Sequence, residues 1–231
     1  MFEPSWLQGY GGLLLQGFSR TLFIACCSYV FGTVLGLALA WAEGCAGVFG
    51  KSCIRFSTLL LRALPELIVI MLLYYACSDL VGWVGMRIGM GLLAVDGTSS
   101  AIIVLGVASS AYAAEIFKSG LAAVSRGASD AGASFGMNRR RIFMRISLPL
   151  MIPIIFPGLS NLWLMVVKGT SLVSVVGVME LALAAEQGAG ATKSYFIFYL
   201  TTAGVYLCIA VFSQRAFVLL ARQLRWQAPD L

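Results

Sequence analysis

Long runs of apolar residues dominate the chain. Each run is close to the length of about 20 residues that crosses a bilayer as a helix. The runs lie at about 21–41, 56–77, 99–117, 146–167 and 195–220. The pattern therefore predicts an all-α integral membrane protein with five transmembrane helices, organised as a single domain over residues 1–231.

Composition supports this assignment. The chain has 231 residues, of which 60% are hydrophobic and 11% charged, and its mean hydropathy is +0.91. A soluble domain is nearer half apolar and a quarter charged, so an ordinary soluble domain is excluded. The six cysteines form no CxxC pair and the chain has no histidine, which argues against a metal centre or a disulfide framework.

The lysines and arginines in the loops predict the orientation. With the N-terminus outside, the inner segments and the C-terminal tail hold eleven of these residues and the outer segments hold four. Loops facing the cytoplasm are enriched in Lys and Arg. We therefore expect an outside N-terminus and a cytoplasmic C-terminus, as five spans require.

Two segments between the spans are distinctive. The polar loop between the third and fourth spans should form one or two short helices at the cytoplasmic face. Its arginines at 139–141 and 145 are typical of an anchor that contacts anionic lipid headgroups, and the loop lacks the aromatic residues that nucleic-acid binding favours. Segment 168–193 is apolar but interrupted by Gly and Ser, which favours a short helix near the outer surface, with a sixth span as the alternative.

The second run contains charged side chains within an apolar window. Arg62 and Glu66 are spaced i and i+4, so on a continuous helix they could form an ion pair. Charge within a membrane is costly and often faces a water-filled path, and Pro65 would free backbone carbonyls at the same turn. A structural pair and a pathway role both remain open, and Lys168 is a further pathway candidate that could instead snorkel to the interface.

One stretch approaches a nucleotide-binding motif. Residues Cys45 to Ser52 read CAGVFGKS and depart from the phosphate-binding pattern GxxxxGK[ST] at the first glycine. That motif works between a buried strand and a helix N-terminus, whereas here it joins two spans. We therefore expect no cofactor in this chain and no hydrolysis by it.

Residues Asp130 to Pro149 read DAGASFGMNRRRIFMRISLP. This segment resembles the cytoplasmic EAA loop of ABC importer permeases, in which the triplet EAA is followed after three residues by Gly and after nine more by Ile-x-Leu-Pro. The matching positions are Asp130, Ala131, Gly132, Gly136, Ile146, Leu148 and Pro149. Asp130 replaces Glu and Gly132 replaces the second Ala, two mild departures that bear on the strength of docking.

Three further stretches narrow the resemblance. RALPELIVIMLLYY from Arg62, SAYAAEIFKSGLAAVSRG from Ser110 and NLWLMVVKGTSLVSVVGVMEL from Asn161 are similar to segments of the polar amino acid permeases, the histidine, arginine and opine branch. The resemblance implies a subunit of an ATP-driven importer in the bacterial inner membrane. Its implied partners are two copies of an ABC ATPase that binds ATP and Mg, a second permease, expected to be a paralogue, and a periplasmic solute-binding protein.

The resemblance also gives the polar residues expected roles. Asp130, Ala131, Gly132 and Gly136 would belong to a coupling helix that docks on the ATPase. Glu66 would face a cationic group of the substrate, and Arg62 or Lys168 its carboxylate, which favours arginine, histidine, ornithine or an opine. The alternatives are a self-contained ion-coupled carrier or channel that uses Glu66 and Glu115, and a membrane anchor for a partner enzyme.

Overall fold

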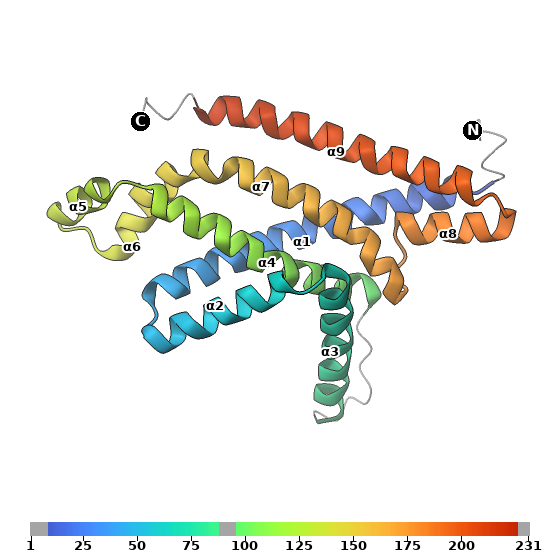
Figure 1. Cartoon of the computed structure of the whole chain (residues 1–231), viewed down its shortest axis with the longest axis horizontal. Coiled ribbons are helices and arrows are strands. Elements are labelled where there is room, and N and C mark those ends of the chain that lie inside the picture. Colours follow the sequence, from blue (N-terminus) through green and yellow to red (C-terminus); the bar gives the residue numbers. More distant parts are fainter. Residues whose placement is uncertain (1–8, 88–95, 226–231) are drawn as a thin grey trace.

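The computed structural model describes residues 9–87 and 96–225. The remaining positions of the expected domain 1–231 lie outside the described residues. Every regular element within the described part is helical (Figure 1). The helices are α1 (Gly11–Cys45), α2 (Val48–Ala63), α3 (Glu66–Arg87), α4 (Gly97–Ala123), α5 (Arg126–Ser134), α6 (Arg139–Ile142), α7 (Leu148–Thr170), α8 (Leu181–Thr192) and α9 (Tyr195–Arg225).

The described residues contain five segments that are long and apolar enough to cross a membrane. Four of them are the helices α1, α3, α4 and α9, and the fifth runs from Arg139 to Val176 and contains α7. The five-span expectation is confirmed at this level. Segment 168–193 contains α8, whose 12 residues extend about 18 Å, too short for a sixth span.

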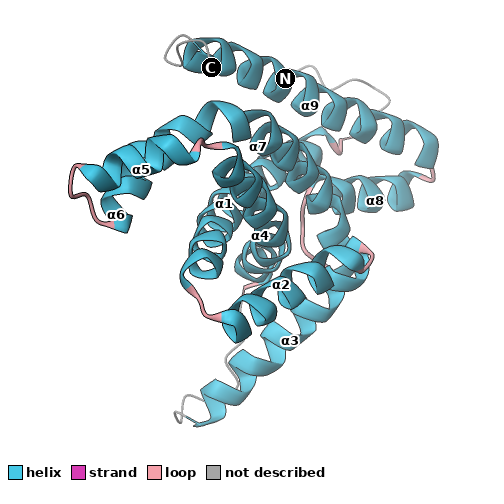
Figure 2. Cartoon of the chain, turned by 60° about the vertical axis from the view of Figure 1, so that its left-hand side comes forward, coloured by secondary structure: helices cyan, strands magenta, loops and turns pink. Residues whose placement is uncertain are grey.

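Helix α4 lies at the centre of the bundle and contacts α1, α2, α3 and α7 (Figure 2). Its long contact with α1 depends on small residues. A Cβ atom added to Gly32 or Gly36 of α1 would lie 2.8 Å from a carbonyl oxygen of α4, that of Gly106 or Ser110. The glycines therefore let the two backbones approach closely, as small residues do in membrane helix pairs.

The predicted span 56–77 is not one helix, and this corrects the sequence-based expectation. Helix α2 ends at Ala63, Leu64 is extended with φ −83° and ψ 150°, and α3 starts at Glu66. The ring of Pro65 disfavours a helical conformation for the residue before it. Helix α3 consequently leaves the direction of α2 and projects from the bundle (Figures 1 and 2).

A buried carboxylate joins the helices at the opposite end of the bundle from α5. Glu180 is fully buried at the N-cap of α8. Its oxygens accept hydrogen bonds from the hydroxyls of Tyr206 and Thr21, at 2.7 and 3.1 Å, and from two backbone N–H groups of α8. Burial raises the pKa of the Glu180 carboxyl, whereas these hydrogen bonds act to lower it. The four donors connect α1, α8 and α9 through one side chain.

We predict that Glu180→Ala lowers the free energy of unfolding by about 1–3 kcal/mol or more, because it leaves buried donors unpaired. Glu186→Ala, which removes an exposed carboxylate from the same helix, should have almost no effect. The relative stability of the two variants is compared through the midpoint of heat-induced aggregation in detergent, which should be lower for Glu180→Ala. Equal midpoints for the two variants would contradict this account of Glu180.

Candidate functional site

The residues of the EAA-like segment lie at one end of the bundle, in the helices α5 and α6 and the start of α7 (Figure 1). Asp130, Ala131 and Gly132 belong to α5. Ile146 lies in a π-helical turn, Phe143–Ser147, and Leu148 and Pro149 begin α7. The expected short helices in this loop are therefore present.

Gly132 packs α5 onto the start of the next span. It is buried, and a Cβ atom added to it would lie 2.6 Å from Cδ1 of Ile146 and 3.2 Å from Cγ1 of Ile142. The substitution of Gly for the second Ala of the motif thus lets two isoleucines approach the helix backbone. Gly132 and Ile146, fourteen positions apart in the sequence, meet in this contact.

Gly136 ends α5 in a left-handed conformation with φ +73°. The N–H groups of Gly136 and Met137 donate to the carbonyls of Ala133 and Gly132, at 2.9 and 3.2 Å. This is the Schellman arrangement, which satisfies the last carbonyls of a helix and favours glycine at the left-handed position. The glycine of the motif therefore has a backbone reason to be glycine.

The outer face of α5 is built from small and polar residues. Asp130, Ala131 and Ser134 are exposed, whereas Gly132 is buried. At the end of the helix the ring of Phe135 is 84% exposed. Sequence reasoning missed Phe135; its signal was a large apolar residue directly before the helix-ending glycine.

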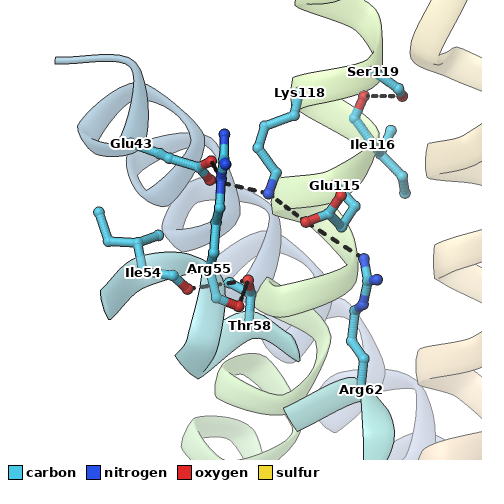
Figure 3. A network of polar contacts seen from close by, with 9 residues as sticks. All are labelled: Glu43, Ile54, Arg55, Thr58, Arg62, Glu115, Ile116, Lys118 and Ser119. Carbon is cyan, nitrogen blue, oxygen red and sulfur yellow. Dashed lines mark hydrogen bonds and ion pairs between the residues drawn. The ribbon is translucent and has the colours of Figure 1, made fainter. Parts of the chain in front are cut away.

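Arg62 does not pair with Glu66. The break at Leu64 and Pro65 separates the two residues onto different helices, so the i, i+4 geometry is lost. The Nη1 atom of Arg62 instead lies 3.6 Å from Oε1 of Glu115 on α4. Figure 3 shows Arg62 and Glu115 within a larger group of charged side chains.

Glu66 begins α3 and lies against α7. Its Oε1 atom is 2.9 Å from the position that a Cβ of Gly169 would occupy, and Leu105 of α4 borders the same point. The Glu66 carboxylate makes no hydrogen bond or ion pair with another described residue. Lys168, next to Gly169, is exposed at the C-terminal end of α7. A half-buried carboxylate without a counter-charge can receive a cationic group.

Comparison with known proteins gives a consistent result. The family model described as "Binding-protein-dependent transport system inner membrane component" matches residues 21–226. The octopine transport system permease protein OccQ of Rhizobium meliloti is 33% identical over 220 residues, which are 94% of this chain and 93% of the relative. The histidine/lysine/arginine/ornithine transport system permease protein HisQ of Escherichia coli (strain K12) is 30% identical over 217 residues, or 94% and 95% of the two chains.

Solved structures share the fold. A chain from a crystal structure of an amino acid ABC transporter with histidines has a TM-score of 0.78 at 24% identity, covering 96% of this chain and 99% of that one. A chain of the MetNI methionine ABC transporter in an inward facing conformation has a TM-score of 0.77 at 19% identity, covering 97% and 99%.

We predict opposite effects for two glycine-to-alanine substitutions in this loop. Gly136→Ala should destabilise the end of α5 by about 1 kcal/mol, because a left-handed backbone is unfavourable for alanine although a Cβ would have open space there. Gly127→Ala, in the first turn of α5 and equally unobstructed, should stabilise the helix slightly. Hydrogen exchange of peptides that cover 126–137 measures both. Equal exchange in the two variants would contradict the role assigned to Gly136.

Proposed function

Because the chain belongs to the family of binding-protein-dependent transport system inner membrane components, we propose that it carries cationic amino acids or opines in an importer of the bacterial inner membrane. The named substrates of its relatives support this choice: octopine for OccQ, and histidine, lysine, arginine and ornithine for HisQ. Family membership favours this function over a self-contained carrier or channel. A separate ABC ATPase would bind ATP and Mg and supply the energy.

In this proposal α5 is the coupling helix that docks on the ATPase. Its inner side is fixed to the fourth span through Gly132 and Ile146, and its end is fixed by the turn at Gly136. Its outer side offers Asp130, Ala131 and Phe135 to a partner. Small residues admit a neighbouring backbone, and the aromatic ring would fill an apolar pocket as an anchor.

The orientation follows the charge distribution. Helices α5 and α6 lie at the end of the bundle where α9 ends, and α8 lies at the end where α1 begins (Figure 1). This arrangement brings the arginines of α6 and those near the end of α9 to one side, which supports a cytoplasmic location for that side. The start of α1 would then face the periplasm, where a solute-binding protein delivers substrate.

The substrate path would pass Glu66. Its carboxylate makes no ion pair with another described residue and lies beside the backbone of Gly169, so a substrate ammonium or guanidinium could supply the missing counter-charge. Of the two cationic candidates, Arg62 contacts Glu115, whereas Lys168 is exposed one residue from Gly169. We therefore favour Lys168 over Arg62 for the substrate carboxylate.

The assembly would contain further chains. Helix α3 is apolar, yet only 11% of the 18 residues of its membrane segment are buried within this polypeptide. Its exposed side chains include Leu72, Leu80 and Trp83. Lipid alone could cover this surface, but a second permease would complete a path between two chains. We propose a paralogous permease and two ATPase copies.

Affinity purification from native membranes in mild detergent tests this proposal. Mass spectrometry should identify an ABC ATPase and a second permease with the tagged chain. Phe135→Ala should lower the recovered ratio of ATPase to permease, because it removes the proposed anchor of α5. Phe196→Ala, which truncates a 78% exposed ring on α9, should leave the ratio unchanged. Recovery of the chain alone, still active in liposomes without ATP, would overturn the proposed function.

We predict that Glu66→Gln weakens ATP-driven uptake of cationic amino acids at least tenfold more than uptake of neutral ones, because it removes the charge but keeps the shape of the side chain. Asp79→Asn is a matched control, since Asp79 is an exposed acid on the same helix. The measurement is uptake of labelled arginine and glutamine by proteoliposomes that contain the complex. An equal loss for both substrates would contradict the pathway role.

A further inference from the structure

Five charged residues form a continuous chain between α1, α2 and α4 (Figure 3). Nε of Arg55 lies 2.6 Å from Oε1 of Glu43, and Nζ of Lys118 lies 3.0 Å from Oε2 of the same carboxylate. Lys118 also contacts Glu115, which Arg62 approaches at 3.6 Å. The charges thus alternate in sign along the chain, and these residues line a groove of about 530 Å³.

Two ion pairs of this network involve α2: Arg55 with Glu43 of α1, and Arg62 with Glu115 of α4. Of its residues, all of which the structure describes, Thr58 alone is buried, and its hydroxyl donates to carbonyls of α2 itself. The large apolar side chains of α2 are instead exposed, among them Phe49 at 82% and Phe56 at 67%. Within this polypeptide, α2 is thus joined to α1 and α4 by charged contacts and by few buried side chains.

Lys118 is the central member of this chain. Its ammonium lies between the carboxylates of Glu43, which is 7% exposed, and Glu115. Arg55, at the outer end, is 68% exposed, so its own ion pair contributes little. Without Lys118, the buried carboxylate of Glu43 would keep only the exposed Arg55, and Glu115 would keep only Arg62 at 3.6 Å. Loss of Lys118 should consequently weaken both contacts that α2 makes through its arginines, because it holds the two carboxylates that accept them.

The five charged residues lie between two parts of the proposed transport machinery. Lys118 is near the end of α4, and two residues, Val124 and Ser125, separate α4 from the coupling helix α5. At the other end, Arg62 is four residues from Glu66, across the break at Pro65. A displacement of α5 that shifts the end of α4 would move Lys118 and Glu115, and would reach α2 through the two carboxylates that pair with its arginines.

We propose that this chain of charges is a latch that holds α2 on α1 and α4 in the state described here and releases α2 when ATP is bound by the partner. Release would allow α2 to move with respect to α4 and to reposition the Pro65 break and Glu66. The inference extends the proposed function, because it requires α5 to respond to the ATPase. The contacts that form the latch lie within this polypeptide, so their effect on α2 can be measured in the isolated permease.

Hydrogen exchange of peptides that cover α2, residues 48–63, tests the latch in the complete complex in nanodiscs. The two states compared are nucleotide-free and ATP-bound with a hydrolysis-deficient partner ATPase. We expect exchange in α2 to be at least about tenfold faster in the ATP-bound state, because a helix that has lost its contacts with α1 and α4 opens locally at a lower free-energy cost. Peptides that cover 181–192 in α8 should exchange equally in both states, because Glu180 fixes that helix. Equal exchange of α2 in the two states would overturn the latch.

Variants test whether Lys118 is responsible. Lys118→Met should give the nucleotide-free complex the rapid α2 exchange of the ATP-bound state and raise ATP hydrolysis in the absence of binding protein. Lys51→Met removes a cation from α2 that makes no ion pair with another described residue, and should change neither.

If Lys118→Met also disturbs α8, Arg55→Gln, at the exposed end of the charged network, replaces it, with a smaller change expected in α2 alone. An effect of Lys51→Met as large as that of the network variants would overturn the latch.

The two proposals can fail independently. If no ATPase assembles with the chain, the proposed function fails, and the latch is judged by α2 exchange of Lys118→Met against Lys51→Met in the isolated permease. Faster exchange specific to Lys118→Met supports charge-dependent seating of α2, whereas equal exchange overturns it. If the complex assembles and transports but α2 exchange never changes, the latch fails and the transport function stands.

Discussion

The close contact between α1 and α4 is the interaction on which the rest of the structure depends. In a bilayer, lipid is as apolar as the side chains, so helices associate through close packing rather than through the hydrophobic effect. The glycines of α1 provide that packing by admitting carbonyls of α4 to within 2.8 Å of where a Cβ would be. With α4 fixed in this way, α2, α3 and α7 are positioned by their contacts with it.

Three polar sites within this apolar bundle differ in how fully their charges are satisfied. Glu180 accepts four hydrogen bonds in a buried site, which suits a fixed joint between helices. Glu43 and Glu115 are paired with cations at the edge of a groove, where water can replace a partner. Glu66 pairs with no other described residue.

The sequence predicted four of the five spans, because apolar length determines which helices can cross a membrane, whereas the run 56–77 instead contains the break between α2 and α3. It also predicted short helices before Pro149 and a short helix within 168–193, and both are present. The local effect of Pro65 was visible, yet the resulting direction of α3 depends on packing against α4 and the 3₁₀ turn Ser171–Val176. The partner of Arg62 lies on α4, 53 positions away, and a periodicity argument covers one helix at a time. Glu180 was missed for the same reason, since two of its four donors, Thr21 and Tyr206, lie on helices that are distant in the sequence.

Helix α4 explains how sites at its two ends could act together. Leu105 borders Gly169 beside Glu66, and Glu115 lies ten residues further along the same helix, a distance of about 15 Å. Helix α4 is continuous and well packed, with 67% of the 18 residues of its membrane segment buried, so a displacement proposed at Lys118 would extend along the helix toward Leu105. Helix α2 lacks such packing, and elements with few buried apolar contacts open at the lowest free-energy cost. The break at Pro65 therefore separates a weakly seated helix, α2, from α3, which Val69 and Ile70 anchor in the core. Motion that begins at α5 would consequently appear in α2 before it appears in α3, and the Glu66 carboxylate lies at the boundary between them.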